Sequence, residues 1–350
     1  MAKRLSRVGT IAIKPEATPG TPETSFSSAN AAVFTYEPNF TPEQDREERV
    51  PMSKYHGSEE DLPGLRRGGI SVRTELYPST DHSTTAPPWA PHLKACGMAE
   101  KALESVAISG VSGAFVGGET ISAGGETAKV AKYLDADGTL YLYDVSGTLS
   151  STATGAESGA TGTLAGDSTA VGLVYHPVTE ESEQAPSTLK FYNDGHVDTI
   201  AGALGNLSIN CQVGEAIKLE MEFSGKLLAP DSATVLEETR PTVRPETFVN
   251  AGLTVKMGAS ASYAPDFESI SLDLGNDLQM PANANDPTGA GYSEATIGSR
   301  SPSGSIDSLA TTQSEHDFMT HLQDAATGPM TFSIGSTSGQ RFEIHCPKIQ

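Results

Sequence analysis

Strict alternation of apolar and charged residues is the feature that most constrains the fold of this chain. In the segment IKLEMEF at residues 217–223, an extended strand carries every apolar side chain on one face and every charged side chain on the other. The same period of two recurs at residues 70–76, 207–211, 253–257, 270–274, 330–334 and 342–346. Strands buried on one face predict antiparallel sheets packed face to face. The expected fold is therefore mainly β, an antiparallel β-sandwich.

Composition and turn signals agree with this fold. The 350 residues include 35 glycines and 22 prolines, and aromatic residues make up only 6%; this mixture suits many short strands joined by turns. Asn193-Asp194-Gly195, between two alternating segments, is a hairpin signal. Short packing helices are expected at residues 89–98 and 314–325. The second helix would begin at the N-cap Ser314 and cover a sheet with its apolar stripe.

Residues 105–172 differ in composition from the rest of the chain. Val111-Ser112-Gly113 and Val145-Ser146-Gly147 lie 34 residues apart, and each precedes a Gly-rich segment. This periodicity predicts two copies of a small β unit. The expected organisation is one sandwich domain made of residues 1–104 and 173–350, with a β-rich repeat domain inserted at residues 105–172.

Residues 41–67 are dense in charge and show no alternation. The simplest interpretation is a solvated loop. A structureless loop of about 25 residues is nevertheless unusual inside a compact domain, and long loops tend to be functional. The alternative hypothesis is an arm that reaches a neighbouring subunit. Its candidate contact residues are Glu43, Asp45, Arg46, Glu48, Arg49, Tyr55, Arg66 and Arg67.

The charge balance argues against one class of partner. Forty-four acidic residues against 23 basic ones give a net charge of −21. DNA repels so acidic a chain unless it carries a concentrated basic patch. The clusters Lys3-Arg4 with Arg7, and Arg66-Arg67, are too short to form one. We also expect no secretory signal, because no apolar segment follows the basic N-terminus, and no membrane helix, because no run of about 18 apolar residues exists.

The sequence contains no phosphate-binding loop, nucleophile elbow or zinc motif. The cysteines at positions 96, 211 and 346 are widely spaced and predict buried thiols. His316 and His321, five residues apart on one predicted helix, would point about 140° apart, which excludes a shared ligand face. We therefore expect no cofactor and no metal.

Two acidic patterns have alternative interpretations. The run from Asp135 to Gly138 is similar to the start of a calcium loop but lacks its further acids. Asp194, Asp198 and Glu215 could be arranged as catalytic carboxylates, whereas solvated turn acids are far commoner. An enzyme is not expected.

Several short motifs follow one another in a defined order. They are SRVGTIAIKPEATPGTPE at residues 6–23, PPWAPHLKACG at 87–97, IKLEMEFSG at 217–225, PETFVNAGL at 245–253, SLDLGN at 271–276 and IGSRSPSGSID at 297–307. Their order, over about 280 residues, resembles that in the tail tube (major tail) proteins of long-tailed, siphophage-type bacteriophages. The ending at residues 347–350 is abrupt for this family, which leaves room for a further strand.

The resemblance implies a structural virion protein that is made in the host cytoplasm and forms stacked, usually hexameric, rings. The rings form the tail tube through which DNA leaves, and partners would include the tape measure, terminator and baseplate proteins. An acidic lumen lets DNA pass without binding. The candidate lumen acids are Glu215, Glu220, Glu222, Asp273 and Asp277. The 105–172 insert would decorate the tube exterior.

Other interpretations remain open at this point. A tail terminator or baseplate ring protein would share the fold. A surface adhesin or carbohydrate binder would suit the Gly- and Thr-rich repeats, although the free cysteines and the missing signal argue against it. A glycoside-acting enzyme would need aromatic platforms, and the chain contains one tryptophan.

Overall fold

The computed structural model describes residues 9–52, 54, 59–78, 85–134, 138–239, 243–249, 251–256, 262–309, 312, 316–335 and 341–350. Strands dominate, all strand pairs are antiparallel, and two short α-helices complete the described part. The expectation of a mainly β, antiparallel fold with short helices is confirmed. Within the described residues, no helix is long and apolar enough to cross a membrane.

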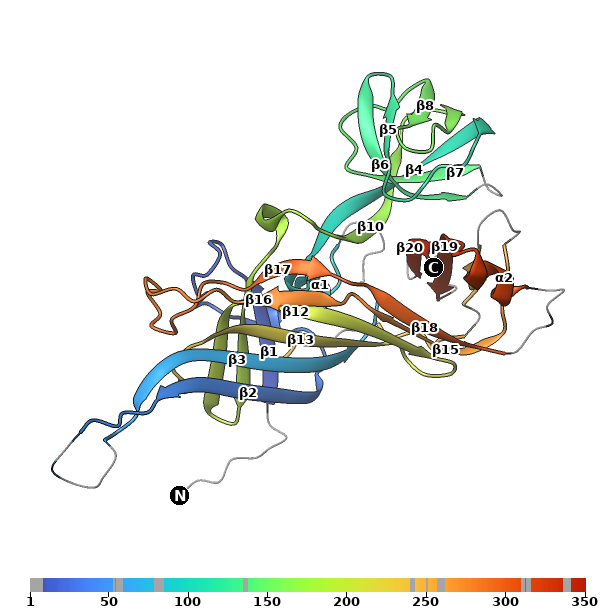
Figure 1. Cartoon of the computed structure of the whole chain (residues 1–350). Helices are drawn as coiled ribbons and strands as arrows, with labels where there is room; N and C mark the ends of the chain where they lie inside the picture. Colours follow the sequence, from blue (N-terminus) through green and yellow to red (C-terminus); the bar gives the residue numbers. More distant parts are fainter. Residues whose placement is uncertain are drawn as a thin grey trace.

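The largest sheet has eight strands (Figure 1). Its order is β1-β11-β12-β13-β3-β2, and β15 pairs with β12 beside β18. The strands are β1 (Gly9–Pro15), β2 (Tyr36–Glu47), β3 (Leu62–Glu75), β11 (Ser187–Asn193), β12 (His196–Gln212), β13 (Lys218–Leu227), β15 (Phe267–Asp273) and β18 (Ser303–Ser308). The strand that the IKLEMEF pattern predicts is β13, at the centre of the sheet.

One face of this sheet is apolar because the alternation stays in register between neighbouring strands. Phe223 lies opposite Ile70, and Met221 lies opposite Val72. These side chains join one core cluster with a three-stranded sheet of β14 (Thr254–Val255), β19 (Gly328–Ile334) and β20 (Phe342–Ile349). The face-to-face packing predicted from the sequence therefore takes the form of a large sheet against a small one. Met257, in one predicted strand, lies outside the described residues.

Helix α1 (Ala90–Ala95) packs between the layers and is shorter than predicted. Its N-cap is Trp89, whose ring is buried and packs against Tyr175 and Phe342. The indole Nε1 donates a hydrogen bond of 2.8 Å to the Tyr77 carbonyl. The helix ends early because Met98, predicted as its last residue, begins β4 (Met98–Ser112).

Helix α2 (Phe318–Gln323) differs from the prediction in its start and its role. Its N-cap is Asp317, whose carboxylate accepts a hydrogen bond from the Thr320 backbone N–H, whereas Ser314 lies outside the described residues. Leu322 is 75% exposed, so the predicted apolar stripe does not cover a sheet. The prediction that His316 and His321 point apart was also wrong: His316 precedes the helix, and the two ring centroids are 4.9 Å apart.

Six further strands close into a small barrel that lies apart from the large sheet (Figure 1). Their order is β4-β7-β6-β5-β8-β9, and β9 pairs back with β4. The bounds are β5 (Thr120–Ala123), β6 (Glu126–Leu134), β7 (Thr139–Tyr143), β8 (Thr152–Gly155) and β9 (Thr161–Leu164). The barrel has its own apolar cluster. The hairpins β5–β6 and β8–β9, which lie in the two predicted repeats, are adjacent through β5 and β8.

The barrel is joined to the rest of the chain by β4 and β10 (Thr169–Pro177), which pair with each other. Arg300 contacts the chain just before β4 and just after β10: its guanidinium donates hydrogen bonds of 3.2 Å to the carbonyls of Gly97 and Val178. Lys132 of the barrel also forms an ion pair with Glu343 of β20. Strand β4 runs from the connection into the barrel without a break, and β10 pairs along its first half. No break in the chain marks residue 105, so the domain boundaries at 105 and 172 stay a prediction. Of the acidic run at 135–138, only Gly138 is described.

Candidate assembly surfaces

The described residues of the charged segment 41–67 include two paired strands, the ends of β2 and β3. Strands β2 and β3 pair from Tyr36 opposite Arg73 to Glu47 opposite Leu62. The hairpin continues past the end of the neighbouring strands as an arm (Figure 1). The interpretation as a structureless loop was wrong because eleven of the twelve residues of β2 are exposed, so no buried face imposes an apolar period on its sequence.

The structure divides the predicted arm residues between strand and tip. Glu43, Asp45 and Arg46 lie in β2, and Arg66 and Arg67 lie in β3. Glu48 and Arg49 follow β2 into the tip, whereas Tyr55 lies outside the described residues. Arg67 and Glu43 are cross-strand partners and form an ion pair of 2.5 Å. Both side chains are half exposed, so the pair contributes little to stability but helps to keep the strands in register.

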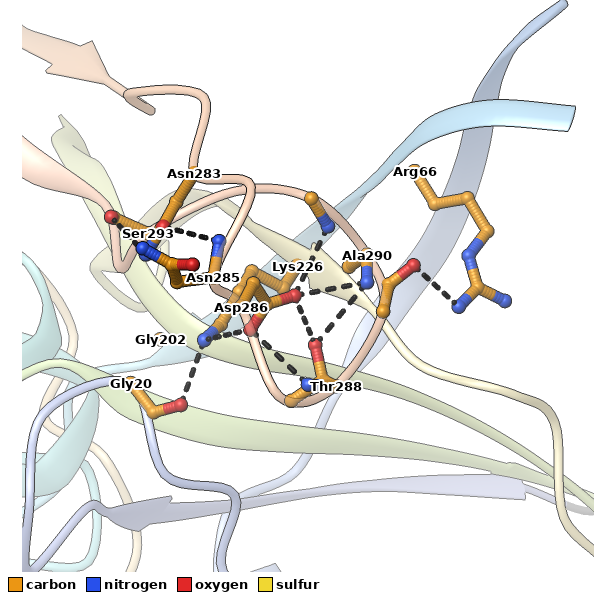
Figure 2. Close-up of polar contacts among 12 residues, drawn as sticks. Gly20, Arg66, Gly202, Lys226, Asn283, Asn285, Asp286, Thr288, Ala290 and Ser293 are labelled. Carbon is orange, nitrogen blue, oxygen red and sulfur yellow. Dashed lines mark hydrogen bonds and ion pairs between the residues drawn. The ribbon is translucent and has the colours of Figure 1, made fainter.

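The base of the arm is supported by the loop at residues 280–295, between β16 (Asn276–Gln279) and β17 (Thr296–Arg300) (Figure 2). The Arg66 backbone N–H donates to the Ala290 carbonyl at 2.9 Å, and the Arg66 guanidinium donates to the Gly289 carbonyl at 3.1 Å. Gly291 has a φ of +81°, and a Cβ there would lie 2.4 Å from the Leu65 side chain. A glycine is therefore required where the loop meets the arm.

A buried carboxylate, Asp286, organises this loop (Figure 2). It accepts hydrogen bonds from the Thr288 hydroxyl at 2.6 Å and from the backbone N–H groups of Ala290 and Gly291 at 2.9 and 3.0 Å. It also forms an ion pair with Lys226 of β13 at 3.4 Å, and the two side chains are 1% and 3% exposed. Burial alone would raise the pKa of Asp286, but the hydrogen bonds from Thr288 and Gly291 and the charge of Lys226 lower it to about 2.

Lys226 extends this cluster to the N-terminal segment. Its ammonium donates a hydrogen bond of 2.7 Å to the Gly20 carbonyl. The Glu16 carboxylate accepts hydrogen bonds of 2.7 Å from the backbone N–H groups of Gly20 and Gly202. Desolvation outweighs these bonds and raises the pKa of Glu16. The N-terminal segment at residues 16–20, the sheet at Lys226 and the loop at residues 280–295 are thus joined beside the arm.

The second candidate surface is the polar face of the large sheet, opposite its core. Cross-strand pairing aligns six strands on it, in the order β2, β3, β13, β12, β15 and β18. One row across them is Arg73, Glu220, Ser208, Asp273 and Ser303. Arg73 lies between two acids, with ion pairs of 2.7 Å to Glu220 and 3.1 Å to Glu37. The face carries carboxylates, of which Glu222 is exposed and Glu220 and Asp273 are half-buried.

Three of the five predicted lumen acids lie on this polar face: Glu220, Glu222 and Asp273. Glu222 is exposed beside Asn206 and Ser71. Asp273 accepts hydrogen bonds of 2.7 Å from the Asn206 side chain and 2.8 Å from the Gly275 N–H.

The other two predicted acids lie elsewhere. Glu215 is in the β12–β13 turn, where it pairs with Lys218 at 2.7 Å. Asp277 is in β16, which pairs with β17 in a separate two-stranded sheet. Neither Asp286 nor Lys226 belongs to a motif or a periodic pattern that predicts this site. The turn residues around Asp286 mark a loop, but nothing in the sequence points to its distant partner.

A model of the phage tail tube protein family matches residues 6–348, nearly the whole chain. The chain belongs to the phage tail tube protein family. The resemblance inferred from the ordered motifs is therefore confirmed at the level of the family. This tail tube protein is a structural component of the phage tail in the virion, and it assembles with other tail components. No individual curated protein matches the chain.

Proposed function

We propose that this protein forms hexameric rings that stack into the tail tube of a long-tailed phage and guide DNA during ejection. The observation that carries the proposal is the six-stranded polar face, whose reverse side is the core. In the described part of the sheet, β2 forms one edge, and β1 and β18 form the other. Unpaired strand edges are templates for pairing with another chain. Pairing of opposite edges between copies is head-to-tail and closes into a ring when the rotation allows.

Negative-stain microscopy of the purified protein tests this proposal. Rings or tubes with a central bore are expected at high protein concentration. Dispersed monomers at every concentration, confirmed by light scattering, would contradict it. In the virion, the tape measure protein would occupy the bore, and terminator and baseplate proteins would contact the tube ends.

The polar face is proposed to line the bore, where its carboxylates repel the DNA backbone and prevent adhesion. A Glu222→Lys variant is therefore expected to assemble normally but to release DNA several-fold more slowly, because the added cations attract phosphates. Glu222 is exposed, so the exchange does not disturb the core.

The measurement is the rate of DNA release from virions triggered in vitro. Glu157→Lys, an equal charge change at an exposed position on the barrel, is the matched control and should release DNA at the parental rate. Equal rates for all three proteins would contradict a lumenal position for Glu222.

The barrel is proposed to decorate the tube exterior. Ser105 and Thr169 are direct cross-strand partners, so an Asn-Gly turn can replace residues 106–168 without breaking the β4–β10 ladder. This variant is expected to form tubes with the parental bore and a smaller outer diameter in electron micrographs. Loss of tubes by a variant that still unfolds cooperatively would show instead that the barrel takes part in assembly.

A further inference from the structure

An open apolar groove lies at the end of the large sheet that is remote from the arm. It is lined by Val213, Phe248, Val249, Pro265, Asp266 and Phe267. Phe248 forms the floor: its side chain is buried, and its ring contacts those of Phe267 and Phe332. The rim is exposed, with Val213 at 52% and Val249 at 53%. We call this hollow the Phe248 groove.

The backbone around the groove is firmly hydrogen-bonded. The Gly214 N–H donates to the Phe248 carbonyl, and the Phe248 N–H donates to the Glu215 carbonyl at 2.8 Å. The Val213 N–H donates to the Glu268 carbonyl at 3.0 Å. The groove is therefore a preformed feature, and its exposed valines cost free energy unless another apolar group covers them.

The arm carries an apolar segment of matching character at its tip, at residues 50–52. Val50 is 75% exposed and Met52 is completely exposed. Pro51 between them is also exposed. Such a segment, held away from the body on two paired strands, gains by burial against a second molecule.

The tip and the groove lie at opposite ends of the same sheet. Strand β3 runs from Leu62 next to the tip to Glu75, which is paired with Lys218 just after the β12–β13 turn that carries Val213. Figure 1 shows the β2–β3 hairpin extending to the lower left and the end of β15 at the right. One copy cannot fold its tip into its own groove across the length of the sheet. A tip-to-groove contact between copies is head-to-tail and leaves a free tip and a free groove for the next copies.

The charges around the two partners are complementary. The apolar segment is preceded by Arg49 and followed by Lys54. The groove contains Asp266, and the exposed Glu268 lies two positions further along. Acids occur on both sides of the tip, at Glu47 and Glu48 and at residues 59–61, so Arg49 and Lys54 are the cations nearest the apolar segment and are the groups that would face Asp266. Charge pairs at the rim then select this orientation.

We propose that residues 50–52 of one copy insert into the Phe248 groove of a second copy of this chain and connect successive subunits. The inference rests on the proposed tube and identifies the acceptor surface for the arm. Residues 50–52 and the Phe248 groove are thereby assigned as the two different halves of one head-to-tail contact. Burial of these exposed valines and of Met52 in the contact supplies affinity, and the flanking charges set the direction in which the segment binds.

A cysteine cross-link tests the contact in assembled protein. The variant Met52→Cys with Val249→Cys is expected to give a ladder of covalent multimers on mild oxidation. Met52→Cys with Val171→Cys is the matched control, since Val171 is 42% exposed on β10. The natural Cys96 and Cys211 are buried and Cys346 is partly buried. The variants Met52→Cys and Val249→Cys, each made alone, measure how much cross-linking these natural cysteines cause.

A second measurement uses the assembly equilibrium. Val249→Asp is expected to raise the protein concentration needed for tubes at least tenfold, whereas Val171→Asp should leave it unchanged. The groove contact would be overturned if the parental protein forms tubes, the Met52→Cys/Val249→Cys variant gives no more covalent multimers than its control, and Val249→Asp assembles normally. The proposed tube would stand in that case. Absence of rings and tubes from the parental protein would overturn the proposed function, and this contact with it.

Discussion

A variant in which an Asn-Gly turn replaces residues 48–61 is expected to be a soluble, folded monomer that forms no tubes. Glu47 and Leu62 are cross-strand partners, so a two-residue turn can close the shortened hairpin. The paired parts of β2 and β3 and the Arg66 contacts to the loop at 280–295 are retained. None of the described residues of the deleted segment belongs to the core cluster.

Light scattering and electron microscopy at matched concentrations measure the loss of assembly, and circular dichroism with thermal unfolding measures the fold. The proposed arm at residues 43–67 predicts an unchanged melting temperature together with complete loss of tubes. The barrel deletion described above removes more residues and provides the comparison. Tubes of ordinary length from the tip deletion would end the idea that the arm connects subunits.

Replacing Asp286 by alanine is expected to lower the free energy of unfolding by about 3–5 kcal/mol, the usual cost of removing one partner of a buried ion pair. Lys226 would lose its ion-pair partner in a site where its side chain is 3% exposed. The turn at residues 286–291 would also lose the acceptor for the N–H groups of Ala290 and Gly291. The loop that supports Arg66 should loosen, so weaker assembly should accompany the loss of stability.

Urea unfolding gives the free energy, and a double-mutant cycle isolates the pair. Lys226→Met in the Asp286→Ala background should recover part of the loss, because the unpaired charge is gone. Asp277→Ala, at an acid outside this cluster, is the control and should change stability by less than about 1 kcal/mol. An Asp286→Ala variant as stable as the parent would show that the ion pair contributes nothing.

The same carboxylate predicts a pH dependence. The pKa of Asp286 is about 2 in the folded protein and has an ordinary value of 3.8. The unfolded chain therefore binds the proton more readily between these values, and stability falls as the pH falls through this range. Above about pH 4 the contribution is fully present. Asp286→Asn should lack this acid-dependent decrement, which urea unfolding between pH 2 and 5 measures.

The periodic strands and the loop-like arm show how far sequence patterns reach. A strand buried on one face must alternate, so residues 217–223 indicated both the core side and the polar side of β13. Strand β2 is exposed on both faces, and no such constraint acts on its sequence. It resembled a charged loop, although the length of the segment already suggested a functional arm.

The candidate lumen acids illustrate the same limit. Alternation placed Glu220 and Glu222 on one polar face, and register with β12 and β15 brought Asp273 beside them. Glu215 and Asp277 were equally plausible by sequence but lie in a turn and in a separate sheet. The His316–His321 contact was missed because helical spacing was applied to a residue that precedes the helix.

The sequence by itself determined the class of fold, the buried faces of the long strands and, through the order of its motifs, the family. These properties depend on local period and composition, which each segment carries independently. The tertiary structure alone decided that β2 and β3 pair as a hairpin, that Asp286 pairs with Lys226, and that Val213, Phe248 and Phe267 form a groove at the opposite end of the sheet. Such features depend on strand register and on contacts between remote segments, and neither leaves a periodic trace in the chain.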